Sequence, residues 1–162
     1  MNRRHARRDL SAALVLATAI AGGSCRGNLS PSEVRGTRAE LNVARGRWSA
    51  RGPVNYRYRF QYLCFCAGSL LTPVEIQVRA GRVVAVLEPA TGRPAPAAPG
   101  RPSPTVEDLF AVVQSALDRD VDWIDVQYDP VLGYPAVVRI DPDTRAVDEE
   151  QSYFAGSLTR MD

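Results

Sequence analysis

Two cysteines one residue apart, in the stretch YLCFCAG, are the side chains of this 162-residue chain whose type and spacing best suit chemistry. Cys64 and Cys66 could form a disulfide, remain two free buried thiols, or serve as a redox or soft-metal site, for example for copper(I). Two residues along a flat strand are about 6.6 Å apart, at the upper edge of the Cα separation of a disulfide. Closing so short a loop stabilises by only about 1.6 kcal/mol before strain is subtracted. We therefore predict a local, strained disulfide that bends the chain, with the other two roles as alternatives.

The remaining composition excludes most familiar catalytic designs. The only histidine is His5, near the N-terminus, and the chain contains no lysine. Without them the rest of the chain has no Ser-His-Asp or Cys-His mechanism, no Schiff-base lysine and no imidazole ligand for zinc. Carboxylate chemistry stays open, although the spacing of the acids does not favour it. We expect no enzymatic activity and no cofactor.

The N-terminal segment predicts where the protein is found. A basic stretch, MNRRHARRD, precedes the apolar residues 10–21 and the small residues GGSC, a pattern typical of an export signal. The apolar run is about half of the roughly 20 residues that a membrane-spanning helix needs. Residues 21–25 resemble a bacterial lipobox, which implies cleavage before Cys25 and lipidation of its sulfur; ordinary cleavage nearby is the alternative. We expect a signal peptide at 1–24, a lipid-anchored tether at 25–36, and export to the cell envelope.

The charge changes once the signal is removed. The whole chain carries 20 basic and 18 acidic residues, and loss of residues 1–24 leaves 16 arginines against 17 acids, so the composition predicts no nucleic-acid partner. Residues 26–104 hold 12 arginines and 4 acids, whereas residues 105–162 hold 4 and 13. We predict that the two halves pack together and neutralise each other. A dipolar surface that steers a charged partner is the alternative.

Two helices are expected from capping signals and apolar periodicity. The first begins with Ser30 as N-cap, Pro31 and Glu33, and its apolar stripe consists of Val34, Leu41, Ala44 and Trp48. The second begins with Thr105 as N-cap and Asp108 in the capping-box position, and its stripe consists of Val106, Leu109, Phe110, Val113 and Leu117.

Six strands are expected around these helices. VNYRYRFQYLCFC alternates aromatic side chains with Arg and Gln, which indicates a half-buried strand with an aromatic inner face. Such a ladder could also stack single-stranded nucleic acid, but export and the near-neutral charge favour core packing. Residues 74–78 and RVVAVLEP form a hairpin about Ala80-Gly81, and a proline-rich loop occupies 91–104. Three further strands lie within VDWIDVQY, AVVRI and AVDEEQSYFAGSL.

The predicted fold class is α+β, with a meandering antiparallel sheet and two helices on one of its faces. The whole of residues 37–162 is expected to form a single domain. A helix followed by three strands occurs twice, so the chain could be an α-β-β-β pair, although no residue-level repeat supports it.

Two loops contain further candidate residues. In YDPVLGYP, Asp129, Gly133 and Pro135 supply turn chemistry, which alone explains the segment. Alternatively, Tyr128 and Tyr134 present an aromatic anchor to a partner. In DPDTRAVDEE, the residues Asp141, Asp143 and Asp148 are weak calcium candidates, and a solvated hairpin is the preferred interpretation.

Several of these motifs occur together in a known family. The residues are Trp48 before Tyr56-x-Tyr58, the Cys-x-Cys pair, residues 106–110 (VEDLF), residues 128–135 (YDPVLGYP), Ile140-Asp141 and residues 148–150 (DEE). Over roughly residues 41–158 the chain resembles bacterial exported proteins and lipoproteins known only as a domain of unknown function. The resemblance implies a compartment and a fold but no reaction. We therefore expect a non-enzymatic binding or scaffold domain with an envelope protein partner, and thiol-redox or soft-metal handling through Cys64 and Cys66 as the alternative.

Overall fold

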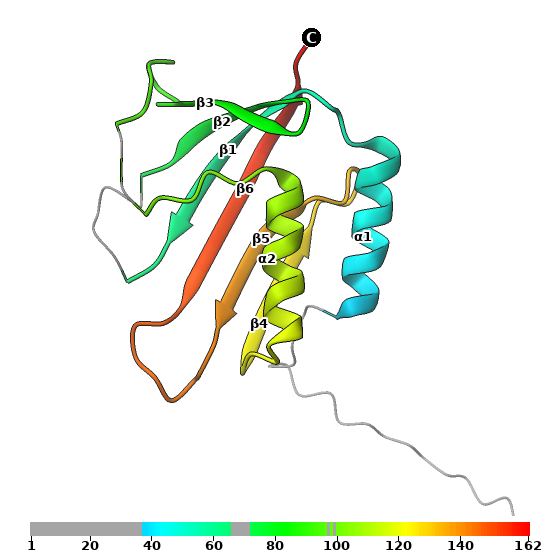
Figure 1. Ribbon diagram of the computed structural model, residues 1–162, viewed down its shortest axis with the longest axis vertical. Helices are drawn as coiled ribbons and strands as arrows, with labels where there is room; N and C mark the ends of the chain where they lie inside the picture. The colour runs from blue at the N-terminus through cyan, green and yellow to red at the C-terminus, as the bar shows by residue number, and fades with distance from the viewer. Residues whose placement is uncertain (1–36, 66–71, 97, 99) are drawn as a thin grey trace, which may run out of the picture. The chain divides into compact units, whose positions relative to one another are not determined.

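A computed structural model describes residues 37–65, 72–96, 98 and 100–162. These residues all belong to one compact unit, Ser32–Asp162. The expected signal peptide, the expected tether with Cys25, and Cys66 lie outside the described residues. The elements are α1 (Arg38–Arg51), β1 (Tyr56–Leu63), β2 (Val74–Arg79), β3 (Arg82–Leu87), α2 (Val106–Asp118), β4 (Trp123–Tyr128), β5 (Pro135–Asp141) and β6 (Gln151–Arg160) (Figure 1).

The six strands form one antiparallel sheet in the order β3-β2-β1-β6-β5-β4. The predicted continuous meander is therefore wrong, because β3 and β4 lie at opposite edges instead of side by side. Each group of three strands is a meander of its own, and the two longest strands, β1 and β6, join them at the centre. The segment containing α2 connects β3 at one edge of the sheet to β4 at the other edge. The second group therefore starts at the edge, with β4, and ends at the centre, with β6. The α+β class stands.

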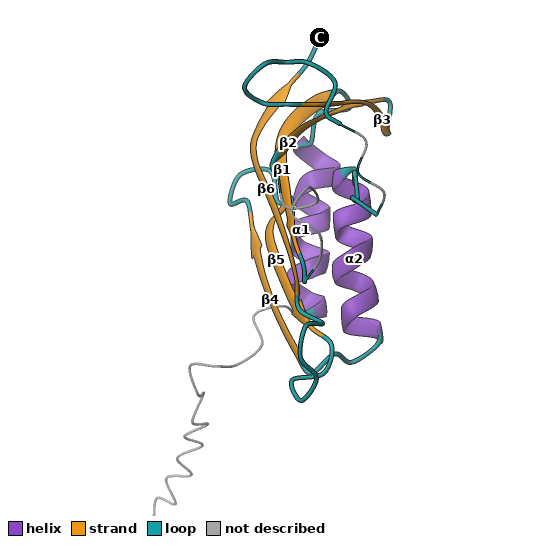
Figure 2. Cartoon of the chain, turned by 90° about the vertical axis from the view of Figure 1, so that its left-hand side faces the viewer, coloured by secondary structure: helices purple, strands orange, loops and turns teal. Residues whose placement is uncertain are grey.

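The predicted element order, a helix and three strands occurring twice, is confirmed, but the two halves are not copies of one α-β-β-β unit, for a geometric reason. Both groups run in the same left-to-right order, β3-β2-β1 and β6-β5-β4, but the antiparallel pairing of β1 with β6 gives them opposite strand directions. Superposing one group on the other requires a half-turn about an axis in the sheet plane, which would put α2 on the face opposite α1. Both helices lie on the same face (Figure 2).

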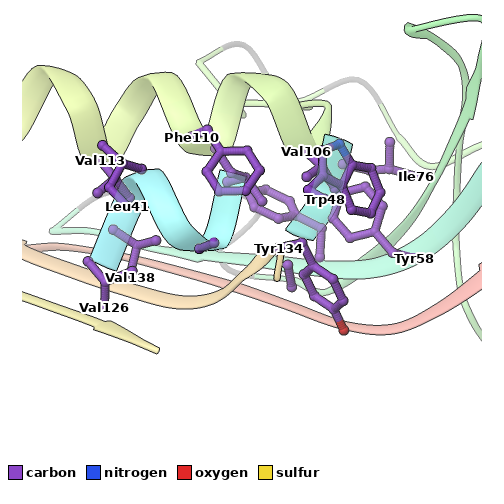
Figure 3. Packing of buried hydrophobic residues seen from close by; sticks show 14 of the residues in the cluster. Leu41, Trp48, Tyr58, Ile76, Val106, Phe110, Val113, Val126, Tyr134 and Val138 are labelled. Atoms are coloured by element: carbon purple, nitrogen blue, oxygen red, sulfur yellow. The ribbon is translucent and has the colours of Figure 1, made fainter. Parts of the chain in front are cut away.

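The core lies between that face and the helices. In β1, Tyr56, Tyr58 and Phe60 point inward and are buried, whereas Arg57 and Arg59 are exposed, which confirms the predicted alternation. Figure 3 shows side chains of both helices meeting side chains of the sheet. Helices and sheet together bury Leu41, Ala44, Trp48, Val106, Leu109, Phe110, Val113 and Ala116 against Val74, Ile76, Val78, Ile124, Val126, Val138, Ile140 and Ala155.

Of the two predicted helix starts, one agrees with the structure and one does not. The Thr105 capping box of α2 is confirmed. The Thr105 hydroxyl accepts from the Asp108 N–H at 3.1 Å, and the Asp108 carboxylate accepts from the Thr105 N–H at 2.8 Å. The first helix begins at Arg38, with Thr37 as N-cap and Glu40 completing the box, so the predicted start at Ser30 is wrong. Ser30 itself lies outside the described residues. Within the described part of the chain, neither helix is long and apolar enough to cross a membrane.

The turns follow the expected chemistry. Ala80 and Gly81 both have positive φ, 47° and 72°, as a two-residue hairpin requires. The predicted proline-rich loop is not fully exposed, because Pro94 pairs with Leu87 at the end of the edge strand β3 and Pro104 is buried.

Candidate functional site

A cleft of about 400 Å³ opens where the end of α1 meets the start of α2. Trp48 and Phe110 come from the two helices and Tyr56 from the start of β1, while Val54, which is 70% exposed, stands at its rim. Two charged side chains of opposite sign, Arg45 and Glu107, also line it. An apolar concavity with a few converging polar groups is the usual form of a small-ligand site.

The carboxylate of Glu107 is held on both oxygens. The indole Nε1–H of Trp48 donates to one oxygen at 2.8 Å, and the hydroxyl of Tyr56 donates to the other at 3.3 Å. The same hydroxyl accepts from the backbone N–H of Val106 at 2.9 Å. Burial raises the pKa of Tyr56, the bond from Val106 lowers it, and the nearby Glu107 charge raises it, with a net rise. The hydroxyl therefore stays neutral and fixes the direction of the carboxylate.

A second buried hydroxyl holds the chain just before α2. Tyr58 donates to the backbone carbonyl of Pro104, and burial raises the pKa of this phenol as well. The hydroxyls of Tyr56 and Tyr58 thus connect β1 to the start of α2 by hydrogen bonds. The aromatic face of β1, which the sequence indicates only as core, also positions Glu107.

Arg45 forms the opposite wall of the cleft. Its guanidinium lies 5.6 Å from the centre of the Phe110 ring and donates one long bond, 3.4 Å, to the Phe110 carbonyl. No ion pair joins it to Glu107 among the described residues, and the remaining N–H groups of this half-buried side chain are available. Sequence reasoning missed this site, because each hydrogen bond that builds it joins residues 51 to 65 positions apart in the chain.

The second candidate surface is the sheet face that the helices leave uncovered (Figure 2). The exposed arginines Arg57, Arg59 and Arg79 stand on its β1–β2 side. A groove of about 460 Å³ crosses the face between β1, β5 and β6, with Phe154 and Val137 among its lining residues.

The acidic half of the same face is partly neutralised. Arg139 pairs with Asp125 at 2.8 Å, and its guanidinium stacks over the ring of Phe154 at 5.6 Å.

Arg38 of α1 pairs with Asp118 of α2 at 2.5 Å, which is an ion pair between the basic and the acidic half of the chain. The two halves thus do pack together as predicted, but they lie side by side in the sheet, and the arginines of β1 and β2 stay exposed.

The predicted tyrosine anchors lie beside α1 and not on an open surface. Tyr134 is only 6% exposed and meets Trp48 edge-on at 6.3 Å, and Tyr128 is half-buried and stacks on Phe110 at 6.5 Å. Burial raises the pKa of Tyr128 to about 12. This placement favours the structural role over the partner-binding role.

Turn chemistry explains the loop between these tyrosines. Asp129 accepts from the N–H groups of Val131 and Leu132 at 2.9 and 2.6 Å, as an Asx-turn does. Gly133 has φ 84° and sits so close to α1 that an added Cβ would lie 2.4 Å from the Ala44 carbonyl oxygen.

The cysteine pair is described only in part. Cys64 directly follows β1 and is half-buried, and the neighbouring Phe65 is 76% exposed. Because Cys66 lies outside the described residues, the bond between the two sulfurs stays a prediction.

The acidic candidates are not brought together. Asp143 pairs with Arg145 at 2.9 Å, which lowers the pKa of its carboxyl, and Asp122 accepts from Thr144. Among the described residues no three His, Cys, Asp or Glu side chains form a metal-binding group, so Asp141, Asp143 and Asp148 do not share a site.

Comparison with known proteins gives one match. Residues 40–160 match the family described as "Family of unknown function (DUF6174)". The chain belongs to this family. The predicted membership of a domain of unknown function, over roughly residues 41–158, is thereby confirmed, whereas the bacterial exported and lipoprotein character remains a prediction. Neither the curated proteins nor the solved structures give a significant match.

Proposed function

We propose that the protein is an exported, non-catalytic binding domain, held at the cell envelope by a lipid on Cys25, that docks an acidic protein partner on the uncovered face of its sheet. The observation that carries the proposal is the set of exposed arginines on β1 and β2, beside an open groove. Residues 1–24 would then direct export, and residues 25–36 would connect the lipid to the domain.

The charge of this face favours a partner over solvent alone. In the described structure, Arg57 donates to the hydroxyl of Thr159 at 3.2 Å and forms no ion pair, whereas Arg79 donates to a main-chain oxygen of the last residue, Asp162, at 2.7 Å. The one acid of β2, Glu75, lies directly opposite Arg59 in the sheet and accepts a bond from Gln77 at 3.1 Å, but it forms no ion pair within the described structure. Exposed arginines without an ion-pair partner, such as Arg57 and Arg59, steer an acidic partner and bind its carboxylates in bidentate fashion.

The groove supplies the apolar part of such an interface. The ring of Phe154 is half-buried and already carries the Arg139 guanidinium on one side. Protein interfaces typically combine an aromatic or apolar centre with arginine and a polar rim. Catalysis has no comparable support, since the chain after the signal contains neither histidine nor lysine.

Site-specific photo-crosslinking in cells that export the chain tests the proposal. A crosslinker at position 59 or 77 faces the proposed partner, whereas one at position 43, an exposed site on α1, serves as the matched control. We expect positions 59 and 77 to yield one common protein adduct. The Arg57→Ser/Arg79→Ser variant should lose this adduct, while Arg51→Ser on α1 should keep it. Adducts from position 43 alone, or lipid adducts alone from position 59, would overturn the proposal.

A thiol-redox role for Cys64 and Cys66 is the second candidate, and one observation favours it. Phe65 stands 76% exposed between the two cysteines, which indicates that the strand end is accessible to a redox partner. Mass spectrometry of the exported protein after alkylation, with and without reductant, measures the oxidation state. A mixture that shifts with the redox potential of the buffer supports redox handling, a fully oxidised pair supports a structural bridge, and two alkylated thiols exclude the bridge.

A further inference from the structure

We propose that the cleft between the helix ends is a binding site for a small zwitterion, which places an ammonium group on Glu107 and a carboxylate or phosphate on Arg45. This site is separate from the uncovered face of the sheet and does not depend on it. The proposal rests on two opposite charges that line one cavity, are each fixed by neighbours, and do not pair with each other.

The acidic side of the cleft is preorganised for a cation. Trp48 and Tyr56 each occupy one oxygen of Glu107, and a carboxylate offers about four lone-pair sites, so room remains for an ammonium donor. The indole and phenol rings, 5.4 Å apart and edge-on, provide aromatic surface beside that position. Cations bind well where a carboxylate and aromatic faces converge.

The basic side is preorganised for an anion. Arg45 is half-buried, and its guanidinium lies over the Phe110 ring and donates one long bond, so most of its N–H groups are without a partner in the described structure. A partly desolvated guanidinium without a counter-ion gains strongly from a charge-assisted bond. A ligand with an anion alone would meet Glu107, and one with a cation alone would meet Arg45, so the pair selects a molecule that carries both.

The remaining walls set the size and polarity of the ligand. The cavity of about 400 Å³ exceeds a single amino acid, and Pro53 and the exposed Val54 give it an apolar rim. An apolar amino acid and the ethanolamine phosphate head of a lipid share the required chemistry. Both are used as probes, L-leucine for the first and O-phosphoethanolamine for the second.

Fluorescence of Trp48 reports on the site directly. The chain has two tryptophans, so Trp123→Phe leaves Trp48, which lines the cleft, as the only source of tryptophan fluorescence. We expect a saturable change with L-leucine or O-phosphoethanolamine. 3-Methylbutylamine and 4-methylvalerate, which each keep one charge of leucine, should bind at least about tenfold more weakly. Absence of a saturable change with both zwitterions up to about 10 mM would overturn the proposal.

Variants separate the two charges from the fold. Arg45→Gln should weaken zwitterion binding about tenfold and leave the weak binding of 3-methylbutylamine unchanged. Glu107→Gln should show the opposite selectivity, weakening the amine and sparing 4-methylvalerate. Arg51→Gln, on α1 outside the cleft, is the control for the loss of one positive charge. Zwitterion binding that survives Arg45→Gln would contradict the assignment, and the Arg57→Ser/Arg79→Ser variant should bind normally, which keeps this test independent of the partner surface.

Discussion

The two faces of the sheet differ most sharply along β1, where neighbouring residues have opposite roles. Tyr56, Tyr58 and Phe60 are each 1% exposed, and the two phenols are hydrogen-bonded to the start of α2. Arg57 and Arg59, between them, face away from the helices and are exposed. One strand therefore has a side that maintains the fold and a side that is free to bind. Stability and binding should respond to separate substitutions.

The largest expected effect is alkaline unfolding of the covered side. Burial raises the pKa of Tyr153 and Tyr128 from 10 to about 12, and it raises those of Tyr56, Tyr58 and Tyr134 as well. A raised phenol pKa in the folded state means that its stabilisation is complete below pH 10 and is lost as pH climbs through the folded value. We expect circular dichroism to show cooperative unfolding between about pH 10 and 12 or above, with tyrosinate absorbance at about 295 nm rising at the same midpoint.

The uncovered face supplies the internal contrast in the same experiment. Guanidinium groups stay protonated throughout this range, so the arginines of that face contribute nothing to the transition. Tyrosinate absorbance that rises fully near pH 10 while the fold persists would contradict the burial of these rings.

The next effect compares adjacent residues of β1. Phe60→Ala removes a ring of the buried core and should lower the free energy of unfolding by about 3–5 kcal/mol. Arg59→Ala on the opposite side should change it by less than about 0.5 kcal/mol. Urea denaturation of both variants measures the pair. A comparable loss for Arg59→Ala would show that the uncovered face is part of the core.

Features of this contrast that depend on neighbouring residues can be predicted from the sequence, whereas those that depend on residues far apart in the chain cannot. The alternation of β1, the Ala80-Gly81 turn and the Asx-turn at Asp129 are local, and the sequence predicts them correctly. The start of α1 is not decided by its capping signal, because Ser30-Pro-Ser-Glu33 and Thr37-Arg-Ala-Glu40 both match the capping box. Gly36 stands directly before Thr37, where a helix that had begun at Ser30 would be weakened.

Strand order and the cleft have no local signature. Pairing of β1 with β6 was not predictable, because alternation specifies which residues face the core and not which strand lies alongside. The contacts of Glu107 with Trp48 and Tyr56 span 59 and 51 residues and exist only once both helices cover the same face. Local chemistry therefore fixes the elements, and burial of a common core fixes their neighbours.

A smaller effect is expected where the covered side meets the β4–β5 loop. Gly133→Ala places a methyl group against the Ala44 carbonyl at positive φ and should cost about 2–3 kcal/mol. Gly46→Ala is its control on the exposed side of α1, where nothing lies within 4 Å, and it should stabilise by about 0.5–1 kcal/mol. Thermal unfolding of the two variants should therefore move in opposite directions. A neutral Gly133→Ala would show that this loop does not pack on α1.

The smallest effect tests whether the tyrosine hydroxyls, beyond their rings, hold the start of α2. Tyr58→Phe keeps the buried ring but leaves the Pro104 carbonyl without its donor, so it should cost about 1–3 kcal/mol. Tyr153→Phe removes a bond to the half-buried side chain of Gln151 and should cost no more than about 1 kcal/mol. Hydrogen exchange at the Val106 and Leu109 amides should accelerate in the first variant and not in the second. Equal exchange in both would show that the Tyr58 hydroxyl does not order this helix start, which would then depend on its capping box and on the bond between Val106 and the Tyr56 hydroxyl.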